Sequence, residues 1–120
     1  AVSRSVLVVD HSDETREVLR SVLQRRGLNI LEARAAQQGW DLARQHQPDL
    51  IVLDMEVETT NGEGMEMPLE APPSGRSTPV IMLGTARRQA AQLPGAEFVS
   101  KPYHYGPLIR RIEELLEDPR

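Results

Sequence analysis

Residues 49–54 read Asp-Leu-Ile-Val-Leu-Asp, a short apolar run between two carboxylates. A continuous apolar run of this length is typical of a strand buried on both faces, as in a parallel sheet covered by helices. Residues 50–53 are therefore predicted to form a central strand. Asp54 is predicted to stand just beyond its carboxyl end.

Similar apolar runs recur on both sides of this stretch and alternate with amphipathic helical patterns. We expect the strands at residues 5–9, 28–33, 50–53, 79–83 and around 98–99. Helices are expected after the N-cap residues Ser12 and Asp13, around Ala36 to Ala43, and from Pro107 onward. Strands that alternate with helices predict a doubly wound parallel sheet, with right-handed crossovers and helices on both faces.

Two crossovers depart from this alternation. After Asp54 the chain carries prolines at positions 68, 72 and 73, which a helix cannot span. The third crossover is therefore expected to be mostly loop, with at most one turn near residues 65–67. The fourth crossover, residues 86–93, has room for only about two helical turns at ~1.5 Å per residue. Both helices are thus predicted to be shortened or lost.

The composition indicates one globular domain over residues 1–120, with 39% hydrophobic and 27% charged residues. The net charge of -4 predicts no broad attraction to nucleic acid or to anionic membranes. The chain has no cysteine, which excludes disulfides and thiol catalysis and fits a reducing cytosol. No apolar run approaches the ~20 residues of a membrane helix. We expect a cytoplasmic domain, and the first residue, Ala1, leaves open whether it is a fragment of a longer protein.

Polar residues follow the predicted strands at the carboxyl edge, where open parallel sheets place their functional groups. These residues are Asp10, His11, Asp54, Lys101 and Thr85, the last of which comes after Gly84. Each of them alone is typical of a turn or a helix cap, but their coincidence at successive strand ends predicts a site. Lys101 is the single lysine among 14 basic residues. Its compact ammonium suits contact with one oxyanion better than a forked guanidinium does.

Five motifs occur in order at residues 8–10, 49–54, 61–62, 79–86 and 95–102. Together they resemble the receiver domain of two-component response regulators, over essentially the whole chain. The resemblance implies a flavodoxin-like fold with the strand order 2-1-3-4-5. It also implies a Lys101–Pro102 bond of a kind that is often cis in the family.

The resemblance implies phosphorelay signalling in which a partner histidine kinase or phosphotransfer protein donates a phosphoryl group to Asp54. The carboxylate would attack phosphorus and form an acyl phosphate. Magnesium would be held by Asp10, Asp54 and the backbone carbonyl of Glu56. The domain would not be an enzyme beyond slow self-phosphorylation and dephosphorylation, and a downstream protein or a fused output domain would receive the signal.

The resemblance also assigns the residues that sense the phosphoryl group. Lys101 would bind one phosphoryl oxygen, and the Thr85 hydroxyl would donate to another. Thr85 and Phe98 would form the switch, because Phe98 stands at the position of the aromatic switch residue of the family.

Three positions are atypical for the family. His11 replaces a second acid, and since Mg²⁺ prefers hard oxygen ligands, we expect weakened magnesium binding. Glu58 replaces a proline, which adds a carboxylate that either assists the metal or repels phosphate. Gly84 stands where a hydroxyl residue is usual, so a one-residue bulge would be needed to bring Thr85 into the site.

A second interpretation follows from these departures. The domain could be a pseudo-receiver, which acts as a protein-interaction module without phosphorylation. An aspartyl-phosphate phosphatase is disfavoured: Glu56 has the spacing of its second carboxylate, but the surrounding residues lack the rest of that pattern.

Overall fold

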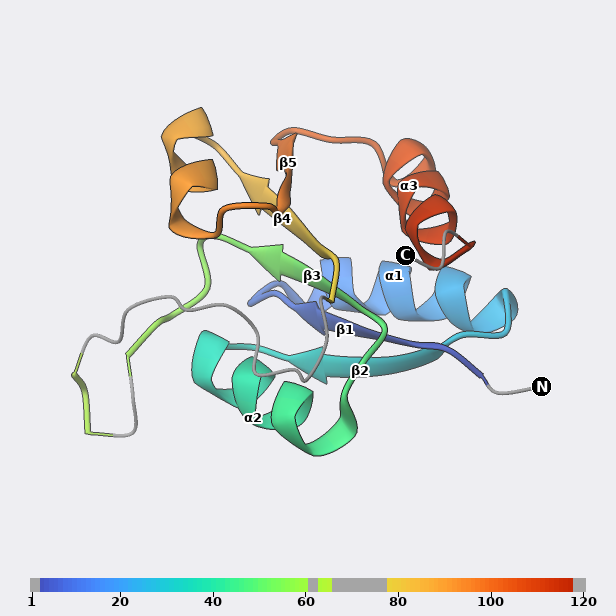
Figure 1. Ribbon diagram of the computed structural model, residues 1–120, viewed down its shortest axis with the longest axis horizontal. Coiled ribbons are helices and arrows are strands. Elements are labelled where there is room, and N and C mark those ends of the chain that lie inside the picture. Colours follow the sequence, from blue (N-terminus) through green and yellow to red (C-terminus); the bar gives the residue numbers. More distant parts are fainter. Residues whose placement is uncertain (1–2, 61–62, 66–77, 118–120) are drawn as a thin grey trace.

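The computed structural model of the 120-residue chain describes residues 3–60, 63–65 and 78–117 (Figure 1). The elements in chain order are β1 Ser5–Val9, α1 Asp13–Arg25, β2 Asn29–Ala33, α2 Ala36–His46, β3 Leu50–Asp54, β4 Val80–Gly84, the 3₁₀ helix η1 Arg87–Gln92, β5 Glu97–Ser100 and α3 Tyr105–Glu117. The five strands form one parallel sheet in the order β2-β1-β3-β4-β5. The predicted doubly wound fold and its strand order are confirmed.

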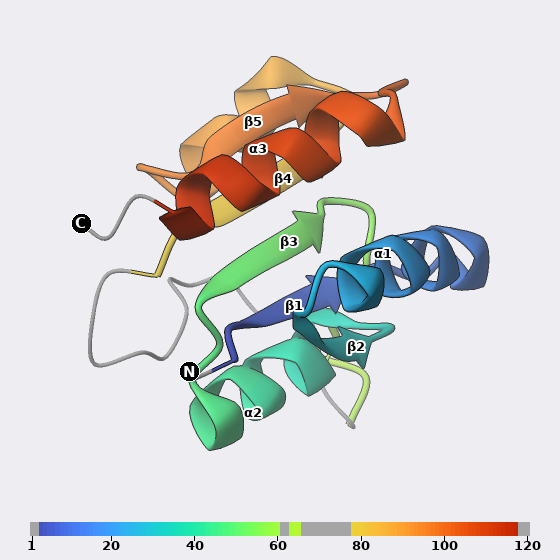
Figure 2. The same cartoon turned by 90° about the vertical axis from the view of Figure 1, so that its right-hand side faces the viewer.

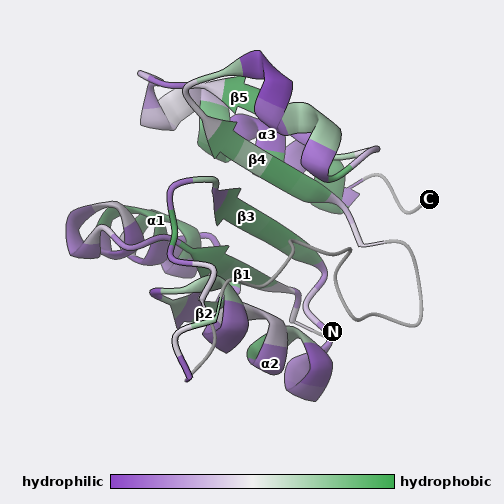
Figure 3. Cartoon of the chain, turned by 90° about the vertical axis from the view of Figure 1, so that its left-hand side faces the viewer, coloured by the Kyte–Doolittle hydropathy of each residue, from purple (hydrophilic) through white to green (hydrophobic). Residues whose placement is uncertain are grey.

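Two hydrophobic cores lie on opposite faces of the sheet. Alternate residues of β3 face each of them: Leu50 and Val52 pack with α1 and α3, whereas Ile51 and Leu53 pack with α2 and the residues around η1. Figure 2 shows α3 over the β4–β5 part of the sheet. Figure 3 shows that β1, β3 and β4 are hydrophobic along most of their length, while the helices carry hydrophilic residues outward. This two-sided burial explains why the strands read as unbroken apolar runs.

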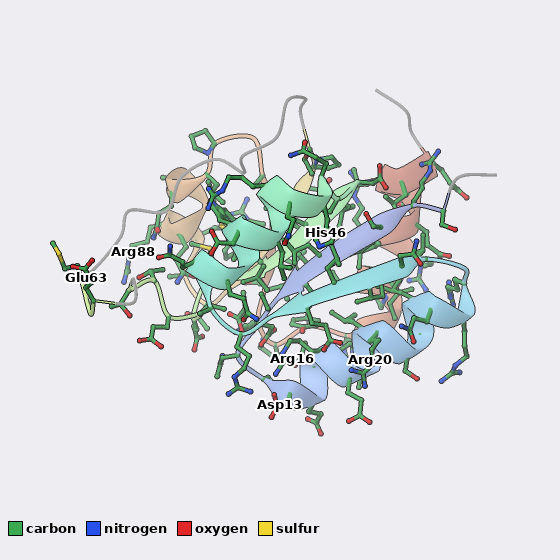
Figure 4. The ribbon with its side chains drawn as sticks, turned by 90° about the horizontal axis from the view of Figure 1, so that it is seen from below. Asp13, Arg16, Arg20, His46, Glu63 and Arg88 are labelled. Carbon is green, nitrogen blue, oxygen red and sulfur yellow. The ribbon has the colours of Figure 1, made fainter. Side chains whose placement is uncertain are left out.

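The start of α1 is fixed by the predicted cap. The Ser12 side chain accepts a hydrogen bond from the Thr15 backbone N–H at 3.2 Å. Arg20 also ties α1 to β2, because its guanidinium pairs with Glu32 at 2.9 Å on the face seen in Figure 4. The cap and the ion pair hold the loop of residues 10–12 at the end of β1.

The described residues of the third crossover are irregular and the fourth crossover contains only a short helix, as the sequence predicts. Residues 55–60 and 63–65 contain turns and isolated bridge residues and no helix, and Glu58 bridges to Ala35. Residue 67 and the three prolines at 68, 72 and 73 lie outside the described residues. The fourth crossover carries η1, whose six residues make about two turns of 3₁₀ helix. No helix in the described part of the chain is both long and apolar enough to cross a membrane.

Candidate functional site

The carboxyl edge of the sheet forms a cleft that contains two buried carboxylates, Asp10 and Asp54, each 2% exposed. The cleft is lined by Asp10, His11, Ser12, Thr15, Asp54, Thr85, Lys101, Pro102, Tyr103 and Tyr105. Most of the residues that the sequence places at strand ends are therefore brought together. Burying two carboxylates is costly unless they are hydrogen-bonded or paired with cations, so their partners decide what the site can do.

Asp54, the last residue of β3, is held by two donors on the same oxygen. Its Oδ1 accepts from Lys101 Nζ at 2.8 Å and from the Glu56 backbone N–H at 2.9 Å. The Lys101 backbone N–H in turn donates to the Gly84 carbonyl at 2.8 Å, which fixes the lysine to the end of β4. Burial alone lowers the pKa of Lys101, but the hydrogen bond and charge of Asp54 outweigh it, and the pKa is raised. Lys101 therefore stays a cation beside Asp54.

Asp10 is anchored by its backbone and by the cap of α1. Its N–H donates to the Ala33 carbonyl at 2.9 Å, and its Oδ1 accepts from the Ser12 N–H at 2.8 Å. Burial raises the pKa of Asp10 to about 6, the Ser12 hydrogen bond opposes this, and the nearby charge of Asp54 adds to it. The Asp10–Asp54 pair thus holds negative charge that a cation would stabilise.

His11 lies at the mouth of the cleft, with 59% of its side chain exposed. Its Nδ1 is 3.9 Å from Asp10 Oδ1 and 3.8 Å from Asp54 Oδ2. One ligand atom from each of these three residues lies within 4.8 Å of the others. Two carboxylates and an imidazole make a donor set that fits a divalent cation.

The β4 side of the cleft is formed by the regular end of β4 and by Thr85. Strand β4 pairs with β5 in unbroken register from Ile81 to Gly84, so this described pair contains no bulge. Thr85, directly beyond Gly84, nevertheless lines the cleft. The described strand pair therefore supplies no bulge, and the placement of the Thr85 hydroxyl on a phosphoryl group stays a prediction.

Gly84 leaves room for the side chain of Gln89. A Cβ at Gly84 would collide with Gln89 Oε1 and would lie 2.9 Å from Phe98 Cε1. Gln89 Oε1 instead accepts from the backbone N–H groups of Thr85 at 3.0 Å and Ala86 at 3.1 Å. The sequence analysis did not single out Gln89. The signal was a glutamine at the third position of a short helix, where such a side chain reaches back to cap the helix start.

The remaining candidates lie around this edge. Glu56 Oε1 is 3.5 Å from Lys101 Nζ, so its side chain adds a second carboxylate near the ammonium. The Glu58 carboxylate instead accepts from the Thr60 hydroxyl at 2.7 Å, and the Glu58 carbonyl accepts from the Ala36 N–H. Phe98 is half-buried in the core on the α2 side, with the Arg87 guanidinium carbon 5.7 Å from its ring centroid. The Lys101–Pro102 bond is cis, as the resemblance implies.

The family model of the response regulator receiver domain matches residues 6–113. The chain belongs to this family. Receiver domains are the signalling domains of two-component response regulators.

Curated relatives are similar in sequence over almost the whole chain, and solved structures share its fold. Response regulator GtcR of Aneurinibacillus migulanus is 28% identical over 120 residues, which cover 96% of this receiver domain and 48% of GtcR. The chain thus spans about half the length of the curated relatives it matches. The non-phosphorylated HemR receiver domain of Leptospira biflexa has a TM-score of 0.75 at 21% identity, with 98% of each chain covered.

A further solved neighbour carries a metal. The receiver domain of sensor histidine kinase PA1611 from Pseudomonas aeruginosa has a TM-score of 0.73 at 19% identity, covering 98% of this chain and all of that one (100%). That structure holds a magnesium ion coordinated in its active-site cleft.

Proposed function

We propose that Asp54 of this receiver domain accepts a phosphoryl group and thereby switches a protein-interaction surface. The observation that carries the proposal is the contact between a buried carboxylate and a lone ammonium, Asp54 Oδ1 to Lys101 Nζ at 2.8 Å, beside Asp10. An ion pair placed only for stability does not require a second buried acid next to it. A site that receives a dianionic group beside a carboxylate does need both a cation and a place for metal.

The chain's own groups account for the transfer. A carboxylate oxygen of Asp54 attacks phosphorus, and the bond from phosphorus to the donor breaks as the donor takes its electron pair. The Lys101 ammonium, which donates to Asp54 Oδ1 before the transfer, would then donate to a phosphoryl oxygen and neutralise its charge. The Glu56 N–H holds the carboxylate in orientation through the reaction. The product is an acyl phosphate on Asp54.

The metal of this site is held, in this proposal, by the carboxylates of Asp10 and Asp54 and by the backbone carbonyl of Glu56. Bound Mg²⁺ would screen the charge of the incoming phosphoryl oxygens. His11 weakens magnesium binding in this proposal, since a neutral nitrogen donor stands where an anionic oxygen would bind Mg²⁺ more strongly. The cluster of Asp10, His11 and Asp54 supports the placement.

The switch involves Thr85 and Phe98. Thr85 lines the cleft and would donate its hydroxyl to a phosphoryl oxygen, which draws the segment after β4 inward. That movement would disturb the hydrogen bond from the Thr85 N–H to Gln89 Oε1, and Gln89 Oε1 and Phe98 Cε1 both lie beside Gly84. A change at Asp54 would thus reach Phe98 through Gln89.

The partners follow from this role. A histidine kinase or a phosphotransfer protein supplies the phosphoryl group, and a downstream protein or a fused output domain receives the signal. We place this exchange in the cytoplasm, and we assign the domain no direct contact with nucleic acid or membrane, since its net charge is -4. Its own chemistry is limited to slow self-phosphorylation and dephosphorylation.

The test is incubation with acetyl phosphate and saturating Mg²⁺, followed by intact mass measurement. The expected result is the addition of one phosphoryl group to the natural sequence and none to Asp54→Asn. His11→Asp is expected to speed labelling because it restores an anionic oxygen ligand. If neither the natural sequence nor His11→Asp gains a phosphoryl group, phosphotransfer is rejected and the pseudo-receiver interpretation takes its place.

A further inference from the structure

His11 gives the cleft a ligand that is chemically unlike its two neighbours. Its Nδ1 stands 3.9 Å from Asp10 Oδ1 and 3.8 Å from Asp54 Oδ2. These separations are too long for hydrogen bonds, so neither carboxylate fixes the imidazole by a direct bond. Two ligands on one metal at ~2.1 Å, in tetrahedral arrangement, lie about 3.4 Å apart. An inward shift of about half an ångström by this exposed ring would therefore suffice for shared coordination.

The two oxygens of Asp54 have separate surroundings. Oδ1 accepts from Lys101 Nζ and from the Glu56 N–H, whereas Oδ2 is the oxygen that faces His11. A cation between His11 and Oδ2 therefore does not have to displace Lys101 from Oδ1. Asp10 is held by the Ser12 N–H, so its carboxylate is oriented by the backbone and does not depend on the cation for its position.

The charge of the cleft distinguishes cation classes. An imidazole that ligates through Nδ1 is neutral, so Asp10, Asp54 and Lys101 together carry a net charge of about -1 before any cation binds. A third acid in place of His11 would make that charge about -2 and would favour every divalent cation. The imidazole nitrogen compensates for the smaller negative charge only with cations that accept nitrogen ligands well, such as Zn²⁺ and Ni²⁺, whereas Mg²⁺ prefers oxygen.

We propose that this cleft binds a divalent cation of the borderline class, represented by Zn²⁺, through His11 Nδ1 and the Asp10 and Asp54 carboxylates, in preference to Mg²⁺. The inference rests on the proposed function and deepens it, because it names the class of cation that the phosphoacceptor site takes. His11 is then a selectivity-determining ligand and not a defect in a magnesium site.

The experiment is calorimetric titration of the metal-free domain with Zn²⁺ and, separately, with Mg²⁺. The selectivity is the ratio of the Mg²⁺ dissociation constant to that of Zn²⁺. His11→Asp is expected to tighten Mg²⁺ much more than Zn²⁺, because Zn²⁺ loses a nitrogen ligand as it gains the charge, so this ratio falls about 10-fold or more. His11 is exposed, so the substitution is not expected to disturb folding.

The matched control is His46→Asp. His46 is the last residue of α2 and is exposed. Figure 4 shows His46 well away from Asp13, the first residue of α1, which follows the cleft residue Ser12. We expect His46→Asp to leave both dissociation constants within about twofold of the natural sequence, since exposed surface changes away from a site have small effects. An equal fall in selectivity in both variants would overturn the proposal, because it would assign Zn²⁺ to scattered surface histidines.

A second readout needs no variant. Titration with Zn²⁺ is expected to shift the ¹⁵N resonance of His11 Nδ1, with the resonances of His46 and His104 unchanged. An unmoved His11 resonance, or an unchanged selectivity in His11→Asp, contradicts the proposal even where acetyl phosphate labels Asp54. Conversely, a shift at His11 together with a failure to label Asp54 rejects the phosphoacceptor function and leaves the cation assignment standing.

Discussion

The carboxyl edge of this sheet has two unlike halves. The charged half contains Asp10, Asp54 and Lys101 at the ends of β1, β3 and β5, with a direct bond from Lys101 to Asp54 and the buried Asp10 beside it. In the other half, Gly84 carries no side chain and Gln89 holds the backbone N–H groups of residues 85 and 86. In the proposed function, the difference teaches that the capacity to receive a phosphoryl group and the means of transmitting it depend largely on separate residues, which can change independently.

The largest effect is expected for Lys101→Gln in the charged half. Loss of the ammonium removes the cation at 2.8 Å from Asp54 Oδ1, and we expect labelling of Asp54 to slow by about 100-fold or more. The measurement is the rate of mass gain with acetyl phosphate at saturating metal. Arg111→Gln is the control, because Arg111 pairs with Glu97 and Glu114 rather than with the site. Equal slowing in both variants would show that Lys101 has no special role.

A smaller effect is expected for Asp10→Asn on stability. Burial raises the pKa of Asp10 from 3.8 to about 6, so the folded state disfavours the ionised form. This unfavourable contribution is absent below pH 3.8 and complete above pH 6. In chelator at pH 7.5, Asp10→Asn is therefore expected to raise the free energy of unfolding by about 1–3 kcal/mol.

The pH dependence is the control for that expectation. At pH 4.5 the folded domain holds Asp10 largely protonated, so the gain from Asp10→Asn is expected to shrink to a fraction of its value at pH 7.5. Urea unfolding curves at the two pH values measure both gains. A gain that is equal at both pH values would mean that desolvation of the Asp10 charge is not its source.

In the half around Gly84, Gln89→Ala is expected to lower the free energy of unfolding by about 1 kcal/mol. The substitution leaves the backbone N–H groups of residues 85 and 86 without their acceptor. Amide exchange at residues 85 and 86 should accelerate about fivefold, which corresponds to that free energy. Gln92→Ala, an exposed glutamine on the same short helix, is the control and is expected to change neither quantity. Unchanged exchange in Gln89→Ala would contradict the assigned capping role.

The smallest effect is expected for Glu56→Gln. The Glu56 carboxylate is 47% exposed and lies 3.5 Å from Lys101 Nζ, a distance at which a solvated ion pair contributes little. The Glu56 backbone N–H, which holds Asp54, is unaffected by the substitution. We therefore expect the labelling rate to change by less than about twofold. A decrease in labelling rate as large as that of Lys101→Gln would show that the Glu56 carboxylate is essential to the site, against this prediction.

The fold and the charged half were predictable because both depend on regular patterns. Unbroken apolar runs give buried parallel strands, and the residue after each run reaches the carboxyl edge. This places Asp10, Asp54 and Lys101 together without knowledge of any side-chain contact. The short helix of the fourth crossover was likewise predictable from the eight-residue length of 86–93.

The second half was less predictable because it depends on how one side chain fills a space. The sequence showed that Gly84 lacks a hydroxyl, but not that Gln89 occupies the space in front of it. Likewise, Glu58 follows Asp54 closely in sequence, yet its carboxylate is held by Thr60. The sequence also left the register at the end of β4 open between a regular strand and a one-residue bulge, and Gly84 pairs with Ser100 as an ordinary strand residue.

The most direct test of Asp54 as the phosphoacceptor is an amide NMR spectrum with beryllofluoride, a phosphoryl mimic that adds to carboxylates. The reference is the spectrum with saturating Mg²⁺ alone. The account predicts that beryllofluoride shifts three amide signals. These are the signals of Glu56, whose N–H donates to Asp54, of Lys101, whose N–H donates to the Gly84 carbonyl, and of Thr85, which lines the cleft. Asp54→Asn is predicted to abolish all three shifts. Unmoved Glu56 and Lys101 signals, or shifts that persist in Asp54→Asn, would contradict the account.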